Sequence, residues 1–300
     1  MMRIVVTGCT GFVGEAVCKE LIGRGHKIIG VARNNPVNLD EIIATNNFSF
    51  YKVDIACPES LKTIFASNQI DCVIHLAAYI PGKECDYQQC ISTNYVGFFN
   101  LLELIRTYNI PNLVFASSQM VYSQNVDSPI AEDALLEPST IYGLSKKQGE
   151  ELSEHYALNH NINTIILRFS GIYGEQKEAG VVHNFIKHAL KNQDLTIDQK
   201  NKTKDIVYIK DAVKLIINSL ENVNDTPFVI VNAGGVSISL YHLAKKIIDL
   251  TSSNSNLVLR GDDTLKNFQL SMSRAENIFG HHPIRLDDAL VEMIDLTRQT

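Results

Sequence analysis

Short apolar runs alternate with longer helical stretches over the first 170 residues, and this alternation constrains the fold more than any other feature of the chain. The runs are nearly continuous in Val, Ile, Leu and Phe, which is typical of strands covered on both faces of a sheet. Strands are predicted at Arg3–Thr7, Lys27–Ala32, Phe48–Asp54, Asp71–Leu76, Asn112–Ser117 and Asn163–Arg168. Helices are predicted at Phe12–Arg24, Ser60–Ser67, Ile91–Tyr108 and Tyr142–Asn159. This order predicts an α/β fold with a doubly wound parallel sheet.

The alternation loosens after about Gly171, which indicates a change of organisation there. We therefore expect residues 1–170 to form the doubly wound domain and residues 171–300 to form mainly a smaller, mixed α/β lobe that binds the substrate. Segments around 203–234 are expected to return to the first domain. With 300 residues, 45% of them hydrophobic, the chain can bury a sizeable core in this arrangement.

Charge and cysteine content exclude several classes of function. The net charge is −6 and the basic residues are scattered, which argues against nucleic acid or an anionic membrane as the main partner. The apolar run at residues 4–6 is too short for a signal peptide or a membrane span, so we expect a cytoplasmic protein. The six cysteines contain no CxxC pair and no histidine at metal-ligand spacing, so we expect reduced thiols and no metal site.

Three glycines lie directly after the first predicted strand and open the first predicted helix. Gly8 permits a tight turn, Gly11 the close approach of a pyrophosphate, and Gly14 the close packing of helix on strand. The phosphates then meet the free N–H groups and the positive dipole at the helix start. The motif predicts a Rossmann-type dinucleotide site that is lined by Gly8, Thr10, Gly11, Phe12, Val13 and Gly14.

The residues that end the second and third predicted strands indicate which dinucleotide binds. An acidic residue at the end of the second strand would hold the ribose 2′-hydroxyl of NAD, but Arg33 follows Ala32 there. Arg33 could accommodate a 2′-phosphate, which favours NADP(H) and leaves NAD(H) possible. The alternative is an ordinary solvated arginine that stacks on adenine. Asp54 is a candidate for the adenine edge, with a turn or helix-capping role as the alternative.

A tyrosine and a lysine four residues apart open the helix that follows the fifth predicted strand. This spacing puts Tyr142 and Lys146 on one helical face, where the ammonium is expected to lower the pKa of the phenol. Ser118 lies at the carboxyl end of the fifth strand, where substrates bind in open α/β sheets. We expect Ser118 to hydrogen-bond the reacting oxygen, Tyr142 to transfer the proton, and Lys146 also to hold the nicotinamide ribose.

Together with further motifs, these residues resemble the extended short-chain dehydrogenase/reductase family, specifically its NAD-dependent epimerase/dehydratase branch, which acts on nucleotide sugars. The resemblance runs almost end to end and includes His75–Ala78, Asn94 with Gly97, Leu167–Gly174, Lys204–Asp211 and the segment from Ser273 to Pro283. It implies that Ser118, Tyr142 and Lys146 are catalytic. It also implies cofactor contacts at Asp54, Ile55, Leu76, Ala77, Ala78, Asn94, Tyr142 and Lys146.

The same resemblance places substrate contacts at Ser118, Gln119, Gly171 and Lys204. Lys204 stands where the family often has an arginine near the nucleotide diphosphate, and Gly171 replaces an asparagine that commonly contacts the substrate phosphate. The identity of the nucleotide therefore stays open. The family's 4,6-dehydratases carry Asp-Glu where this chain has Gln119 and Met120, and its 3,5-epimerase/reductases carry cysteine at the position of Met120. Both of those functions are disfavoured, because neither Gln119 nor Met120 can do that proton chemistry.

Two enzymatic functions remain. A 4-ketoreductase delivers hydride from NADPH to the 4-keto carbon of a nucleotide-linked deoxysugar while Tyr142 donates the proton. A nucleotide-sugar 4-epimerase, similar to UDP-glucose/galactose 4-epimerase, oxidises and then reduces C4 with a tightly held NAD. Arg33 favours the reductase, which we take as the prediction, and the family's many epimerases favour the other.

Two further expectations concern turnover and assembly. A sensor that binds NADP without turnover is an alternative of another class, which the complete Ser–Tyr–Lys set disfavours. The family commonly pairs two helices that correspond here to Ile91–Tyr108 and Tyr142–Asn159, so we expect a homodimer.

Overall fold

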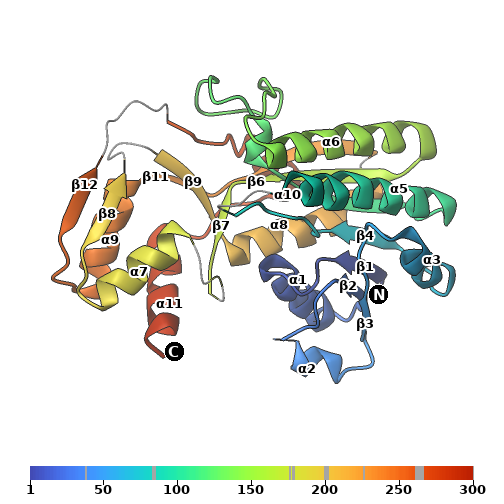
Figure 1. Ribbon diagram of the computed structural model, residues 1–300, viewed down its shortest axis with the longest axis horizontal. Coiled ribbons are helices and arrows are strands. Elements are labelled where there is room, and N and C mark those ends of the chain that lie inside the picture. The colour runs from blue at the N-terminus through green and yellow to red at the C-terminus, as the bar shows by residue number, and fades with distance from the viewer. Residues whose placement is uncertain are drawn as a thin grey trace. The chain divides into compact units, whose positions relative to one another are not determined.

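The computed structural model describes residues 1–37, 39–82, 86–175, 177, 180–198, 203–225, 227–260 and 267–299, and its chain divides into two compact units (Figure 1). The first unit comprises Met1–Ser123, Leu135–Arg168 and Val213–Val231. The second comprises Gln124–Ala134, Phe169–Ala212 and Asn232–Thr300.

The first unit is built on a seven-stranded sheet. Its strands are β1 (Arg3–Thr7), β2 (Lys27–Ala32), β3 (Phe48–Lys52), β4 (Cys72–His75), β5 (Asn112–Ser118), β6 (Asn163–Phe169) and β10 (Phe228–Ala233). They are ordered β10-β6-β5-β4-β1-β2-β3, and β1 pairs in parallel with both β2 and β4. The predicted doubly wound parallel sheet is therefore confirmed. The strand order reverses between β1 and β4, so ligands are expected at the carboxyl ends of these two strands.

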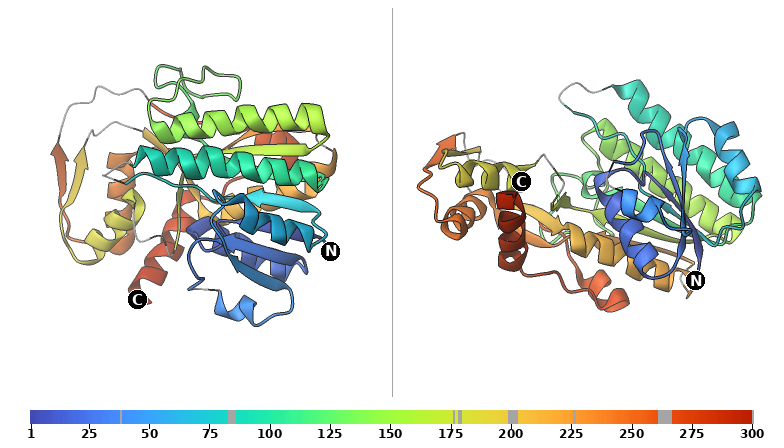
Figure 2. Two further views of the ribbon diagram at one scale, coloured as in Figure 1. Left: turned by 45° about the vertical axis from the view of Figure 1, so that its right-hand side comes forward. Right: turned by 90° about the horizontal axis from the view of Figure 1, so that it is seen from below.

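Helices cover both faces of this sheet. They are α1 (Phe12–Gly23), α2 (Asp40–Ile43), α3 (Pro58–Ala66), α4 (Tyr87–Ile91), α5 (Phe98–Thr107), α6 (Ile141–His160) and α8 (Ile209–Asn222). Helices α5 and α6 run side by side on one face, with α1 on the other (Figures 1 and 2). Between the sheet and α5, the ring of Phe98 stacks on that of Phe115, with centroids 4.5 Å apart. Burial of such side chains stabilises the fold by about 1.5–3 kcal/mol each.

The helix predicted at Ile91–Tyr108 is not one continuous α-helix. It begins earlier, as α4, and passes through the π-helical turn Ser92–Gly97 before α5. The wider turn coincides with tertiary contacts, because the side chain of Asn94 bonds the backbone of Tyr79 and a Cβ atom at Gly97 would lie 2.7 Å from Ile55. Apolar periodicity carries no signal for such a turn, and π-helical turns often occur at functional sites.

The second unit contains two small sheets. One consists of β7 (Gly171–Tyr173), β9 (Thr203–Tyr208) and β11 (Val236–Ser239), and the other of β8 (Leu195–Asp198) and β12 (Leu257–Arg260). Its helices are α7 (Val181–Leu190), α9 (Leu240–Thr251), α10 (Ser273–Phe279) and α11 (Leu286–Gln299). The buried carboxylate of Asp205 joins three segments, because it accepts hydrogen bonds from the N–H groups of Gly235 and Leu270.

The described residues contain no helix that combines the length and the apolar character needed to cross a bilayer. Among them, His, Cys, Asp and Glu side chains also form no group of three that could hold a metal ion.

Candidate functional site

The glycine loop brings backbone against backbone at the carboxyl ends of β1 and β4. Gly8 has a φ of +73°, which favours glycine, and its N–H donates to the carbonyl of Val31 at 2.8 Å. A Cβ atom there would lie 2.7 Å from the amide nitrogen of Ala77, and one at Gly14 would lie 2.1 Å from the carbonyl oxygen of Gly8. The loop is therefore closed to any larger residue at these positions.

The start of α1 is formed by a glycine. Gly11 is exposed and precedes the first helical residue, and it has no side chain that could cap the helix. The first-turn N–H groups and the positive end of the helix dipole are suited to a pyrophosphate. Thr10, Phe12 and Val13, the other residues of the predicted site, are half-buried in and directly after the same loop.

Buried polar contacts fix the neighbouring end of β4. The Thr7 hydroxyl lies 2.7 Å from Nδ1 of His75 and also accepts a hydrogen bond from the N–H of Ala77. Burial and then the charge of Lys146 lower the pKa of His75 well below its ordinary value, so the imidazole is neutral. Leu76, Ala77 and Ala78, predicted as cofactor contacts, are half-buried beyond this strand end.

The ends of β2 and β3 differ in the use of their side chains. Residues 32–37 are Ala, Arg, Asn, Asn, Pro and Val, so no carboxylate follows β2 at the ribose position, and Arg33 is exposed. At the end of β3, Asp54 accepts a hydrogen bond from the N–H of Ala56 at 2.9 Å. Asp54 thus stabilises a turn, and its contact with the adenine edge stays a prediction. Ile55 is buried beside Gly97.

The carboxyl end of β5 meets the start of α6. The hydroxyl groups of Ser118 and Tyr142 are hydrogen-bonded, and Nζ of Lys146 donates to the carbonyl of Ala116 at 2.7 Å. The ammonium also lies 5.8 Å from the centre of the Tyr142 ring. Gly143 allows α6 to approach the end of β5 closely, because a Cβ atom there would lie 2.2 Å from the carbonyl oxygen of Met120. The structure therefore brings the three predicted catalytic residues together.

The contact between the end of β5 and the start of α6, with Ser118, Tyr142 and Lys146, is called the seam below. The pKa shifts in this seam correct one prediction. Burial raises the pKa of Tyr142 to about 12, although the hydrogen bond from Ser118 opposes the shift. The prediction of a lowered pKa for this phenol is wrong for the free chain, because desolvation by burial is the largest influence on it and raises the pKa. Burial instead lowers the pKa of Lys146 to about 8, with Glu150 opposing that shift. Tyr142 is consequently protonated at neutral pH, which is the form that has a proton to donate.

Asn94, predicted as a cofactor contact, forms hydrogen bonds with other groups of the chain. Its amide oxygen accepts from the N–H of Tyr79 at 2.7 Å, and its amide nitrogen donates to the carbonyl of the same residue and to the Ser145 hydroxyl. Asn94 thereby ties the loop after β4 to α6 beside Lys146.

The predicted substrate contacts lie in both units. In the first unit, Gln119 follows Ser118, and its buried side-chain oxygen has no hydrogen-bond partner among the described residues. In the second unit, Gly171 opens β7 and pairs with Ile206 of β9, two residues beyond Lys204. Gly171 and Lys204 are both exposed.

A buried ion pair that was not predicted lies beside this seam. Glu150 of α6 and Arg168 of β6 form it, with side-chain exposures of 4% and 2%. The signal was present, because Glu150 follows Lys146 by four residues on the same helical face and Arg168 interrupts an apolar strand.

Comparisons with known proteins show the family of the chain. The sequence profile of the NAD dependent epimerase/dehydratase family matches residues 4–234. A putative UDP-glucose 4-epimerase of Methanocaldococcus jannaschii is 34% identical over 239 residues, which are 77% of this chain and 76% of that protein. A UDP-glucuronate 4-epimerase of Thermodesulfobacterium geofontis is 27% identical over 98% of this chain and 96% of its own. The crystal structure of UDP-glucuronic acid 4-epimerase from Bacillus cereus in complex with NAD superposes with a TM-score of 0.88, at 26% identity and 99% coverage of both chains.

Proposed function

The chain belongs to the NAD dependent epimerase/dehydratase family of enzymes, and we propose that it is a 4-ketoreductase of a nucleotide-linked deoxysugar. The observation that carries this proposal is the end of β2, where buried Ala32 and exposed Arg33 replace an acidic residue. A carboxylate there would repel a 2′-phosphate, whereas a guanidinium attracts it. This favours NADP(H), the cofactor of a reductase that consumes its reductant.

The residues of the glycine loop fit a dinucleotide. The cradle at Gly8 and Gly14 would be filled by a Cβ atom, and the start of α1 offers N–H groups to a pyrophosphate. Arg33 would hold the 2′-phosphate and Lys146 the nicotinamide ribose, while Ala77 and Ala78 border the cradle. When bound, the cofactor supplies the hydride.

The seam between β5 and α6 supplies the proton. The hydroxyl of Tyr142 donates it to O4 of the sugar as the carbonyl is reduced, and the hydroxyl of Ser118 hydrogen-bonds the same oxygen. The Lys146 ammonium then stabilises the phenolate that remains, from 5.8 Å away in the free chain. The pKa of about 12 keeps Tyr142 protonated before the reaction.

Substrate contacts are proposed at Gln119, Gly171 and Lys204. A buried acceptor without a partner costs free energy, and a sugar hydroxyl would satisfy the side-chain oxygen of Gln119. Lys204 would contact a phosphate of the nucleotide, and Gly171 would border the same phosphate. Neither Gln119 nor Met120 can exchange a proton at neutral pH, which disfavours water loss from the sugar.

A nucleotide-sugar 4-epimerase is the second candidate, and the relatives favour it. Proteins named UDP-glucose 4-epimerase and UDP-glucuronate 4-epimerase match most of this chain. In that reaction Tyr142 first accepts the proton of the 4-hydroxyl and later returns it, and the hydride taken from C4 would be held by the bound cofactor between the two steps. The same three residues serve both reactions.

The cofactor retained by the purified protein tests the choice. Protein is denatured after purification, and the released nicotinamide nucleotide is separated and quantified by absorbance. We expect little NAD⁺, and binding of NADPH in preference to NADH when the protein is titrated. Stoichiometric NAD⁺ would overturn the reductase in favour of the epimerase. No hydride transfer with any keto sugar would favour a sensor that binds NADP without turnover.

A homodimer is also proposed. Val96, Phe99 and Leu158, on the π-helical turn and on helices α5 and α6, are exposed apolar side chains that a second copy could cover. Light scattering at micromolar concentration should give twice the mass of 33.5 kDa, and a monomer mass would contradict the proposal.

A further inference from the structure

One face of α6 contacts three successive residues of β5, residues 116–118. Tyr142 hydrogen-bonds the hydroxyl of Ser118, and Nζ of Lys146 donates to the carbonyl of Ala116 at 2.7 Å. Glu150 accepts a hydrogen bond from the hydroxyl of Ser117. The three α6 residues are spaced four apart and therefore share a helical face. Glu150 therefore lies one helical turn beyond Lys146 in the row that Tyr142, Lys146 and Glu150 form on α6.

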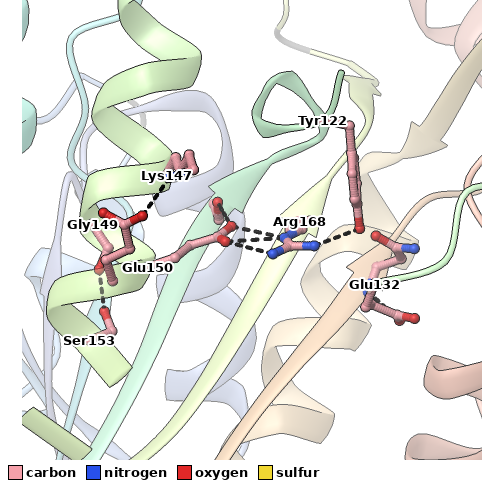
Figure 3. Close-up of polar contacts among 10 residues, drawn as sticks. Tyr122, Glu132, Lys147, Gly149, Glu150, Ser153 and Arg168 are labelled. Carbon is pink, nitrogen blue, oxygen red and sulfur yellow. Dashed lines mark hydrogen bonds and ion pairs between the residues drawn. The ribbon is translucent and has the colours of Figure 1, made fainter. Parts of the chain in front are cut away.

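Arg168 holds the carboxylate of Glu150 in a fixed orientation (Figure 3). The Nε atom of Arg168 lies 3.0 Å from one carboxylate oxygen, and Nη2 lies 2.7 Å from the other. The remaining terminal nitrogen donates to the hydroxyl of Tyr122 at 2.8 Å. Tyr122 in turn bonds the carbonyl of Gln119 through its own N–H. The network thus joins α6 to β6 and to the turn that follows Ser118.

A buried ion pair is weak evidence for stability, because desolvation of the two charges offsets their attraction. Its position next to Tyr142 and Lys146 points to a different role. We propose that Glu150, oriented by Arg168, is a positioning residue for the reaction, which holds the end of β5 against α6 and places a negative charge one helical turn from the Lys146 ammonium. This inference rests on the proposed function, because it assigns Lys146 its part in proton transfer.

The groups around Lys146 show why a carboxylate is needed. Tyr142 and Glu150 face it from α6, Cys90 from α4, His75 from β4, and β5 presents a carbonyl and the ring of Phe115. His75 is neutral, so it adds no positive charge that would lower the pKa of Lys146. Burial lowers the pKa of Lys146 to about 8, and Glu150 is the largest opposing influence. Without that charge, the ammonium would lose its proton closer to neutral pH.

The test measures the ionisation of Lys146 directly. Protein labelled with ¹³C at the lysine Cε is titrated by NMR, and the signal of Lys146 is assigned from its loss in Lys146→Arg. In Glu150→Gln, we expect the titration midpoint to fall by about one pH unit or more. The matched control is Glu151→Gln, the same change at the next residue of α6, whose side chain is 59% exposed and pairs with Lys147. Its midpoint should equal that of the native protein.

A second variant protects the test against misfolding. Glu150→Gln leaves the Arg168 charge buried without its partner, so Glu150→Gln/Arg168→Met removes both charges together. We expect this double variant to fold and to shift the midpoint in the same direction by a smaller amount. A folded double variant with the native midpoint would overturn the inference.

Turnover separates positioning from mere structural support. With NADPH and a keto sugar, the pH above which kcat falls should move down together with the NMR midpoint, while KM for the sugar changes little. A loss of activity equal at every pH would show a structural role and overturn the inference. If the native protein has no turnover, the proposed function fails, and the NMR midpoints still decide what Glu150 does to Lys146.

Discussion

The glycine loop and the seam between β5 and α6 are two halves of one candidate site, and they are built in different ways. In the loop, backbone meets backbone, and the cradle at Gly8 and Gly14 exists because side chains are absent. In the seam, the site is formed by side chains, and Lys146, Glu150 and Arg168 are charged groups buried in a nonpolar environment.

Because of this difference, we expect each half to respond to a different kind of change. A site made of close backbone contacts is sensitive to added volume and insensitive to pH. A site made of buried ionisable groups is sensitive to charge and pH, and a substitution of equal size can abolish its chemistry. Four substitutions, taken in order of expected effect, test this contrast.

Tyr142→Phe should give the largest effect. The phenol is the proposed proton donor, so its removal should lower kcat by about 10²- to 10⁴-fold, while NADPH binding changes little. Steady-state kinetics and fluorescence titration of the cofactor measure the two quantities. Tyr87→Phe, at an exposed tyrosine of α4, is the control and should retain native kinetics. Native turnover in Tyr142→Phe would remove the seam from the mechanism.

Lys146→Met should reveal the cost of the buried charge. The folded-state pKa of about 8 lies below the ordinary 10.5, so the unfolded chain binds more protons between these values and native stability rises with pH there. The variant lacks this dependence. Its stability advantage over the native protein should therefore shrink by about 3 kcal/mol from pH 8 to 10.5. Urea unfolding at several pH values measures it, and a constant difference would contradict a desolvated Lys146.

Gly14→Ala should damage the loop through volume alone. The added methyl group would lie 2.1 Å from the carbonyl oxygen of Gly8, so we expect a loss of about 1–3 kcal/mol in stability and of cofactor binding. Gly23→Ala, in the same helix, meets no atom within 4 Å and is the control. It should be neutral or stabilise the protein by up to about 1 kcal/mol. Equal effects at both positions would refute the contrast between the two halves.

Arg33→Ala should give the smallest effect, on cofactor choice. Loss of a charge-assisted contact to the 2′-phosphate should weaken NADPH binding by about ten- to a hundredfold and leave NADH binding nearly unchanged. Fluorescence titration with both cofactors measures the ratio, with Arg24→Ala as an exposed control on the other side of β2 in sequence. Equal loss for both cofactors would make Arg33 an adenine contact and would weaken the case for the reductase.

The sequence alone determined the sheet and the two motifs of the site. β1 and β2 have the predicted bounds and α1 begins at Phe12, because apolar periodicity and backbone preference are local properties. The positive φ of Gly8 and the shared helical face of Tyr142 and Lys146 follow from residue type and spacing in the same way.

Tertiary structure alone decided the electrostatics. The π-helical turn at Ser92–Gly97, the raised pKa of Tyr142 and the pairing of Glu150 with Arg168 were not predicted. Each depends on burial by segments distant in sequence, and burial sets the cost of a charge. Spacing along one helix can place Tyr142 and Lys146 together, but it cannot show how much water the fold removes from them.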